Sequence, residues 1–493
     1  MRLSARGTDA VASSDGGNAD RARLGAGRRV RAFALGALTA ALVACATYTP
    51  APIDPAQTAE TFAARRLDAP ALRDAVVRVA PQAVAAWPPR EWDRATLLAV
   101  ALAQNGSLGV GRAEVEAALA AEITAGQKAN PTIGLQSEYA RREPDHWLYG
   151  ISFDFLLSRR GDLDSRLAKL GTGGARAQLM ERTWNVRHAL IGALSDDENA
   201  RRRLKILTEL ADAQDRLVAL QQRRVDAGED APTDLNAALG IAIDIEQQQA
   251  QARADAVAAQ AAVAAALGVP PAALDGVAIV WPDWGDPPPF AQERLQTARE
   301  QALLSRADLA VAINEYTEAE TKLERAIARQ YPQIDLQPGY YWDHGIAKWP
   351  FDVDFTLPLF NRNRGEIAET TAARTLAGQR MLALQAGIYG EIEAGARAED
   401  VARANLEAAR KRENAMSQQV KHADVALGLG AGDRMQRTAV EVIALRAKLE
   451  ALQAQAQQQA ARNALENALH APLSGPELLL ATPEPNADSG AER

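Results

Sequence analysis

Two aspartates beside glycine-rich turns are the side chains of this chain best placed to bind an ion. Asp433 follows the run Leu427–Gly432, and Asp234 lies in the comparable place after the run Gly228–Pro232. A carboxylate there can cap the following helix by accepting a backbone N–H, which stabilises a helix by about 1 kcal/mol. Where several copies of the chain converge, the same carboxylate can attract cations. The sequence leaves both roles open for each aspartate.

The other candidates for catalysis or metal binding are scattered along the chain. No two histidines lie four residues apart, and the methionines form no cluster, so the sequence contains no zinc or copper motif. The run GLGAG at 428–432 lacks the lysine and the preceding strand of a phosphate-binding loop. We therefore predict a protein that is not an enzyme, with no metal site and no cofactor. The histidines are His146, His188, His344, His422 and His470.

The single cysteine, Cys45, excludes an internal disulfide framework. It follows a basic stretch and the apolar run Ala32–Ala44, which is long enough for a signal peptide but too short to span a bilayer. Leu-Val-Ala-Cys at 42–45 resembles the lipobox of bacterial lipoproteins, and Ala46 in that family goes with outer-membrane sorting. We expect a leader over residues 1–44 and a lipid such as palmitate on Cys45. The alternatives are an ordinary signal peptide with an incidental cysteine, or a short buried helix.

Composition indicates long helices and excludes one class of partner. The formal net charge of −8 provides no basic field of the kind that draws a protein to nucleic acid. Alanine, leucine, glutamine, glutamate and arginine dominate the long proline-free runs, which is typical of extended helices. Residues 45–90 contain frequent prolines and are predicted to form an extended N-terminal segment.

The chain contains an internal duplication. Placing Pro131 on Pro332 aligns PTIGLQSEY with PQIDLQPGY, and upstream it aligns Leu108 with Leu309. A repeat of this kind predicts one architecture made of two halves. We place the first repeat at 91–269, a linker at 270–290, the second repeat at 291–471 and a flexible tail at 472–493.

Each repeat contains a predicted strand hairpin. The expected strands are 132–143 and 147–158, then 333–342 and 349–360, and all alternate apolar with polar residues. Soluble sheets alternate too, but Trp147, Trp342 and Trp349 at strand ends favour a membrane sheet. Four strands cannot close a barrel, so several copies would have to share one. In such a barrel Phe153 and Phe355 are expected to face lipid, and Asp154 and Asp354 the lumen.

A very long helix and a return helix follow each strand hairpin. Shorter helices are predicted at 93–104 and 108–129, and the long ones at 162–227, 233–267, 365–426 and 433–470. The longest would reach about 95 Å at 1.5 Å per residue, so it cannot belong to a compact domain. Leu204, Ala211, Val218 and Val225 recur every seven residues, which is typical of a coiled coil. Helix, tight turn and helix predict antiparallel hairpins.

In their order and doubling, these parts resemble the TolC family of outer-membrane efflux ducts over about residues 90–470. The motifs that carry the resemblance are NPTIGL and YPQIDL before the strands, and AGEDAPTDLNAA and GAGDRMQRTAVE at the helix turns. The lipobox makes the chain similar to the lipoprotein branch that serves resistance-nodulation-division pumps. The fold implied is mainly α with a small β part, built from long helical hairpins and two strand hairpins.

The resemblance implies a homotrimer in the outer membrane of a Gram-negative bacterium, anchored by lipid. Twelve strands would form its barrel and twelve helices a periplasmic tunnel, with a periplasmic adaptor and an inner-membrane pump as partners. It would be the passive exit duct of a tripartite efflux or secretion system. Asp433 and Asp234 become candidates for a channel constriction. The alternative is a lipid-anchored coiled-coil scaffold that conducts nothing. Adaptor contacts are expected at the hairpin tips, at Gly228, Glu229, Asp230, Gly430 and Gly432.

Overall fold

The computed structural model describes residues 48–80, 87–128, 130–140, 146–157, 161–332, 334–343, 345–355, 357 and 359–479. The expected leader and Cys45 lie outside these ranges. The chain divides into two compact units, Met1–Thr61 and Phe62–Arg493. The first unit holds most of the short helix α2 (Pro55–Ala63), and the second holds all the elements described below.

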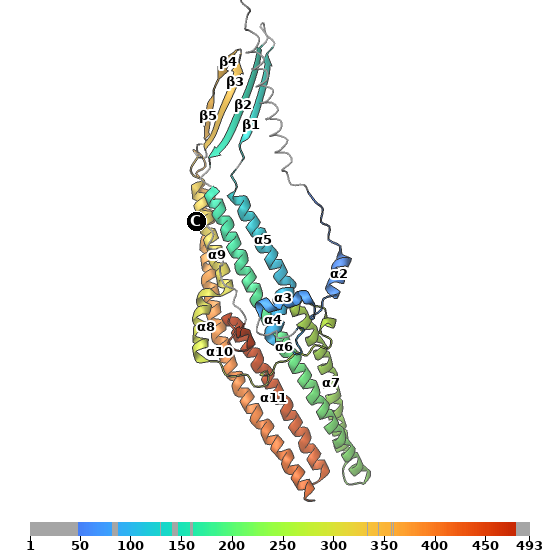
Figure 1. Ribbon diagram of the computed structural model, residues 1–493. Helices are drawn as coiled ribbons and strands as arrows, with labels where there is room; N and C mark the ends of the chain where they lie inside the picture. The colour runs from blue at the N-terminus through green and yellow to red at the C-terminus, as the bar shows by residue number, and fades with distance from the viewer. Residues whose placement is uncertain are drawn as a thin grey trace, which may run out of the picture. The chain divides into compact units, whose positions relative to one another are not determined.

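Two long helical hairpins dominate the second unit (Figure 1). Helix α6 (Gly161–Asp226) packs against α7 (Pro232–Leu267), and α10 (Arg364–Gly428) packs against α11 (Arg434–Leu469). Both turns contain a glycine with a positive φ angle, 75° at Gly228 and 72° at Gly430. Other residues adopt this backbone conformation only at a cost in free energy. Contacts between α6 and α11 join the hairpins side by side. None of the described helices is both long and apolar enough to cross a membrane.

The duplication is visible in the shorter helices. Helix α4 (Arg94–Gln104) breaks at Asn105 and continues as α5 (Gly106–Gly126), while α8 (Gln292–Ser305) breaks at Arg306 and continues as α9 (Ala307–Ala328). The aligned residues Leu108 and Leu309, each 1% exposed, occupy matching places just after the two breaks. Helix α5 packs on α6, and α9 packs on both α6 and α10. The predicted fold class, mainly α with an internal two-fold repeat, is confirmed.

The core lies where the short helices, the linker and the long helices meet. Its largest cluster surrounds Leu97, Leu190, Leu267 and Trp284, and a second contains Ile388 and Leu465. Towards the hairpin turns the core narrows to a seam of Leu207, Leu210, Ala213, Ile245 and Val442. The coiled-coil prediction is right for Leu204 and Ala211, which pack at this seam. Val218 and Val225 lie outside the seam and are only half-buried.

The ends of α4 and α7 meet at one arginine. Arg65 Nη1 donates to the carbonyl oxygens of Gln104, at 3.2 Å, and of Gly268, at 2.7 Å. The C-terminus of a helix carries a partial negative charge and unpaired carbonyls, so this one cation satisfies two helix ends. Gly268 itself has a φ of 77° and packs closely on the backbone of Gln104.

The strands of both repeats form one antiparallel sheet. β1 (Thr132–Ala140) pairs with β2 (His146–Leu157), β2 with β3 (Ile334–Asp343), and β3 with both β4 (Ile346–Lys348) and β5 (Phe351–Phe355). The single strand expected at 349–360 is wrong in two respects. Its pairing begins earlier, at β4, and is interrupted at Pro350, which lacks the backbone N–H that a ladder needs. Among the described residues it ends at Phe355 rather than at 360.

Candidate functional site

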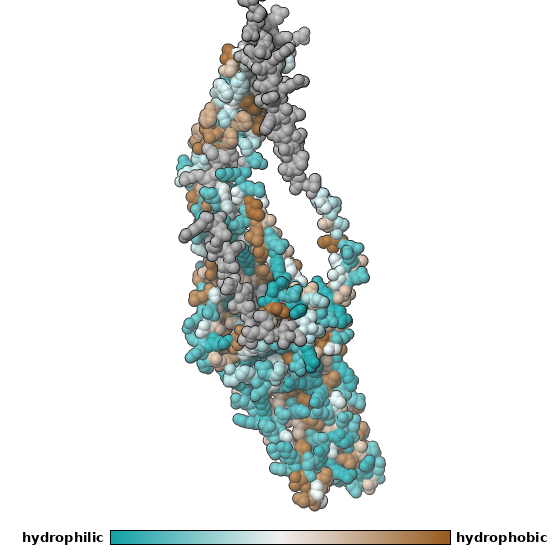
Figure 2. Space-filling view, viewed as in Figure 1, coloured by the Kyte–Doolittle hydropathy of each residue, from teal (hydrophilic) through white to brown (hydrophobic). Residues whose placement is uncertain are grey.

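The pairing register places the apolar side chains of all three long strands on one face of the sheet. Ile133 pairs with Phe153, Ile151 pairs with Tyr340, and Leu336 pairs with both Phe155 and Val353. Directly paired residues point to the same side of a sheet, so the alternation predicted for each strand adds up to a continuous surface. Most of these residues are exposed, and Figure 2 shows apolar residues gathered over the strands. The exposed members are Ile133, Leu135, Tyr139, Trp147, Tyr149, Phe153, Phe155, Ile334, Trp342, Phe351, Val353 and Phe355.

The opposite face is polar and acidic. Thr132 pairs with Asp154, Asp335 pairs with Asp354, and Gln337 pairs with Asp352. Gln337 Nε2 also donates to a carboxylate oxygen of Asp354 at 3.3 Å. The register therefore puts Phe153 and Phe355 on one face and Asp154 and Asp354 on the other, as the sequence predicts. Six acidic side chains of the described strands share the polar face: Glu138, Asp154, Asp335, Asp343, Asp352 and Asp354.

Aromatic rings collect at the end of the sheet that lies away from the helices. Tyr139 and Trp147 have ring centroids 4.6 Å apart, Trp147 stacks on Tyr149 at 5.8 Å, and Tyr149 lies 6.3 Å from Trp342. Trp349, between β4 and β5, packs edge-on against Tyr340 at 4.8 Å. Rings of this kind mark the level of lipid headgroups in membrane sheets.

The two candidate aspartates occupy different positions at the hairpin tips. Asp433 is the N-cap of α11, and its side chain accepts a hydrogen bond from the backbone N–H of Met435 at 3.3 Å. Helix α7 instead begins with Ala231 as its N-cap and Pro232 in its first turn, and no side chain caps it. Asp234 lies inside that first turn, so the capping role considered for it is wrong, because Pro232 starts the helix two residues earlier.

Arg224 connects the two tips. Its guanidinium lies 3.0 Å from Asp230 and 3.6 Å from Glu229 in its own turn, and 3.5 Å from a carboxylate oxygen of Asp433 in the other hairpin. The arginines that follow Asp433 on its own helix are Arg434 and Arg437. Arg437 instead pairs with Asp424, at 2.7 Å, and with Glu441. No spacing in the sequence identifies Arg224, because the two turns are far apart along the chain.

A basic groove runs between the hairpins next to the tips. It has a volume of about 420 Å³ and is lined by Arg216 and Arg223 of α6, Arg434 and Arg437 of α11, and Leu427. Leu429 at the turn is highly exposed, and Figure 2 shows apolar residues at the end of the α10–α11 hairpin. Exposed glycines and an exposed leucine therefore lie beside a groove lined by four arginines, of which Arg216 and Arg437 pair with Glu441.

Buried ion pairs join the two repeats in the core. Arg187 of α6 and Glu466 of α11 lie 2.6 Å apart with both side chains almost fully buried. Arg94 of α4 lies 3.5 Å from Glu477 and stacks on Trp281 of the linker. Burial raises the pKa of Glu477, against the attraction of Arg94 and Arg187. Sequence reasoning missed these charges, since a buried charge on a helix looks like a solvated one until its partner is known.

Comparison with known proteins identifies the fold. No family model and no curated protein matches the chain. Among solved structures, the outer membrane protein VceC of Vibrio cholerae is 15% identical and covers 77% of this chain and 97% of its own, with a TM-score of 0.62.

Two further structures, described as channels, show the same likeness. The CmeC outer membrane channel of Campylobacter jejuni is 14% identical, with a TM-score of 0.62 over 76% of this chain and 85% of its own. The MtrE outer membrane channel of Neisseria gonorrhoeae, in its open state, is 16% identical, with a TM-score of 0.60 over 76% of this chain and 88% of its own. The chain therefore has the fold of these outer-membrane channel proteins, the fold that its resemblance to the TolC family predicts.

Proposed function

We propose that this chain forms the outer-membrane exit duct of a tripartite efflux or secretion system. The observation that carries the proposal is the two-faced sheet, with a continuous exposed apolar face and an acidic face behind it. A sheet in hydrocarbon must cover one face with lipid and must leave no backbone group unpaired. A sheet that lines a water-filled pore needs a polar second face.

Assembly of three copies supplies what one sheet lacks. Within the described residues β1 pairs on one side only, with β2, and β5 pairs only with β3. Joining β5 of one copy to β1 of the next would close these edges, and three copies would form a barrel with an acidic lumen. The helical hairpins of three copies would then form the wall of a tunnel on the periplasmic side.

In this assembly the hairpin tips are the surface for a periplasmic adaptor, which links the duct to an inner-membrane pump of the resistance-nodulation-division type. Gly228, Glu229 and Asp230 lie at one tip, and Gly430 and Gly432 at the other. The basic groove beside them favours an adaptor with acidic side chains. Asp433, and in a lesser role Asp234, would line the constriction, where Asp433 is paired with Arg224. Cys45 would carry the lipid that anchors each copy in the outer membrane.

Conductance measurements distinguish the proposed duct from a lipid-anchored scaffold. The full chain and Cys45→Ala are reconstituted into planar bilayers, and single-channel currents are recorded. A duct gives discrete conductance steps with both proteins and needs detergent for extraction even without the lipid. A scaffold gives no steps, and its Cys45→Ala form dissolves without detergent. Mass spectrometry of the mature N-terminus tests lipidation, and an unmodified peptide that begins upstream of Cys45 would exclude it.

Block by divalent cations tests the constriction. Added on the periplasmic side, they should block the channel, because like carboxylates around a narrow axis attract cations. Asp433→Ala should weaken the block, and Asp230→Ala, in the neighbouring turn, should leave it unchanged. Equal block in wild type and Asp433→Ala would leave Asp433 with the capping role only.

A further inference from the structure

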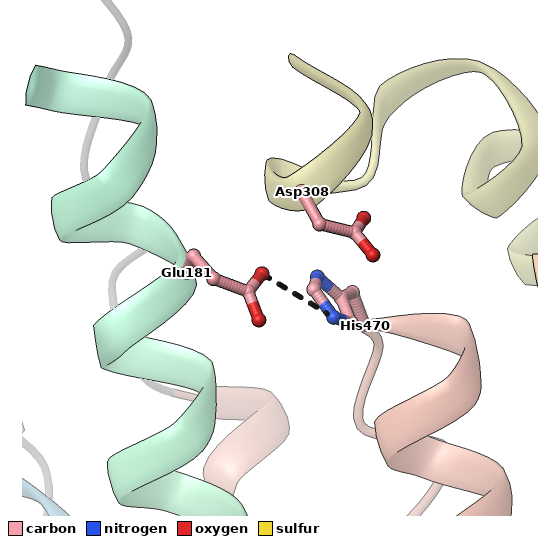
Figure 3. A group of neighbouring side chains, drawn as sticks. All are labelled: Glu181, Asp308 and His470. Atoms are coloured by element: carbon pink, nitrogen blue, oxygen red, sulfur yellow. Dashed lines mark ion pairs between the residues drawn. The ribbon is translucent and has the colours of Figure 1, made fainter. Parts of the chain in front are cut away.

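Three side chains from distant parts of the sequence meet beside the break between α8 and α9 (Figure 3). Glu181 comes from α6, Asp308 from the first turn of α9, and His470 is the C-cap residue of α11. One ligand atom from each lies within 4.8 Å of the other two. His470 Nε2 is 3.7 Å from a carboxylate oxygen of Glu181.

The His470 imidazole is held in place by its neighbours, but one of its ring nitrogens has no hydrogen-bond partner among the described residues. His470 adopts a left-handed conformation, with a φ of 47°, and its side chain is 6% exposed. The indole of Trp184 stacks on it with ring centroids 5.4 Å apart. Among the described residues, neither His470 Nδ1 nor Glu181 Oε2 has a hydrogen-bond partner. Buried polar atoms normally have partners, so two unpartnered atoms within one cluster of side chains favour a site for a ligand.

Asp308 is held in the geometry of a ligand by its neighbours. Arg306 donates to both of its carboxylate oxygens, at 3.0 and 2.7 Å, and the backbone N–H of Leu309 donates to one of them at 2.8 Å. Each oxygen can accept more than one bond, so a lone pair is left for a cation. Metal-binding carboxylates are commonly oriented by such outer hydrogen bonds.

The charges around the three side chains favour a divalent cation. Arg306 pairs with Asp308 and, at 3.1 Å, with Glu391, and Glu181 adds a third carboxylate, so the formal charge of these four groups is −2. A neutral imidazole has a lone pair on one ring nitrogen and is a common ligand for transition metals. Burial and repulsion from Asp308 raise the pKa of Glu181. A bound cation would remove that repulsion.

We propose that Glu181, Asp308 and His470 bind one divalent transition-metal ion. One imidazole with two carboxylates is a borderline donor set that suits Zn²⁺ better than Ca²⁺ or Mg²⁺, which prefer oxygen ligands alone. Ligand atoms that share a metal at about 2.1 Å lie at most about 4.2 Å apart. The ligand atoms lie within 4.8 Å of one another, so the present spacing exceeds that limit by at most about 0.6 Å. The ion would join α6 of the first repeat to α9 and the end of α11 in the second.

Zinc binding to the full chain tests the proposal. The protein is purified in detergent through a tag without histidines, stripped with a chelator and titrated with Zn²⁺ in excess Mg²⁺, which occupies exposed carboxylates. Calorimetry and elemental analysis after dialysis should give one tightly bound Zn²⁺ per chain, and Zn²⁺ should raise the thermal midpoint. Absence of a saturable site at that stoichiometry would overturn the proposal.

Two substitutions locate the site, each with a matched control. His470→Asn keeps a residue that tolerates the left-handed conformation, and Glu181→Gln keeps the shape of the side chain. Each should weaken Zn²⁺ binding at least tenfold and abolish the rise in the thermal midpoint. His422→Asn and Glu407→Gln, at exposed places on α10, should change neither. If His470→Asn fails to fold, Glu181→Gln decides alone, and wild-type affinity in that variant refutes the assignment.

Discussion

The cost of an arginine substitution in the sheet should depend on the depth of the residue in the membrane as well as on the face of the sheet. β2 has 12 residues, so at about 3.3 Å per residue and a tilt near 40° it spans ~30 Å along the membrane normal, enough for an apolar band ~25 Å tall. Ile151 lies near the middle of β2 on the apolar face. Phe355 lies on the same face but pairs with Ile334, which is at the helix-proximal end.

The positions of Ile151 and Phe355 determine how much an arginine at each should destabilise the chain. Arginine on the lipid face costs about 2–4 kcal/mol near the bilayer midplane and about 0–1 kcal/mol near the interface. Ile151→Arg should therefore destabilise each chain by about 2–4 kcal/mol, which is at least an order of magnitude in the folding equilibrium. Phe355→Arg should cost about 0–1 kcal/mol, and Asp354→Arg, on the polar face, less still. Gln136→Arg is the matched control, because Gln136 pairs with Gly150 beside Ile151 but faces the other way.

The measurement is denaturant unfolding of the full chain in phospholipid vesicles, followed by tryptophan fluorescence. Trp147, Trp342 and Trp349 lie in or beside the sheet and report on its environment. Cross-linking of the same samples reports the amount of trimer. If Ile151→Arg and Gln136→Arg are tolerated equally, the sheet does not contact hydrocarbon and the duct proposal loses its main support.

Three further predictions concern the helical part and can be checked by loss of helical circular dichroism in denaturant. Gly268→Ala should lower the free energy of unfolding by more than about 2 kcal/mol, because a Cβ there would lie 2.5 Å from the backbone oxygen of Gln104 and the φ angle is positive. Gly276→Ala is the control, since its φ is also positive but a Cβ there meets no atom, and it should cost about 1 kcal/mol. Arg187→Met should cost about 3–5 kcal/mol by leaving Glu466 buried without its partner, and adding Glu466→Gln, whose amide oxygen can still accept from the backbone N–H of Leu473, should restore most of that loss; a single variant as stable as wild type refutes the role of the pair. Burial raises the pKa of Glu477, so the folded chain binds the proton more tightly than the unfolded chain. Relative to Glu477→Gln, the wild type should lose stability as pH rises from the ordinary value of 4.5 through the raised pKa, and a difference that grows in the opposite direction refutes the assignment.

The fold could be predicted from the sequence because its signals are long and repeated. The proline-free runs determine the long helices, and the runs around Gly228 and Gly430 mark their turns. Alternation in the strands was enough to place Phe153 and Asp154 on opposite faces. The depth of each strand residue in the membrane was not predictable in the same way. Only the pairing with Ile334 shows that Phe355 is near the end of the sheet. The break at Pro350 was visible in the sequence, but its effect on pairing was underestimated.

The sites were harder to predict because their members are far apart in sequence. Arg224 meets Asp433 across two hairpins, and His470 meets Glu181 across the two repeats. Heptad patterns show which helix faces are apolar, but they do not show which helices of the other repeat those faces meet. Read alone, His470 was an ordinary helix histidine, whereas in the structure it is buried between two carboxylates.

The outer edges of the sheet, which have no pairing strand among the described residues, have a consequence for the cell. A single copy with exposed backbone edges and an exposed apolar face is prone to stick to other chains, so it needs protection until it assembles. In the proposed duct, the joining of three copies depends steeply on their concentration, whereas unwanted pairing of two copies depends on it less steeply. Low expression should therefore slow channel formation more than it slows loss to aggregates. The yield of channels should then be set as much by the supply of new chains, and by the chaperones that shield them, as by the stability of the finished assembly.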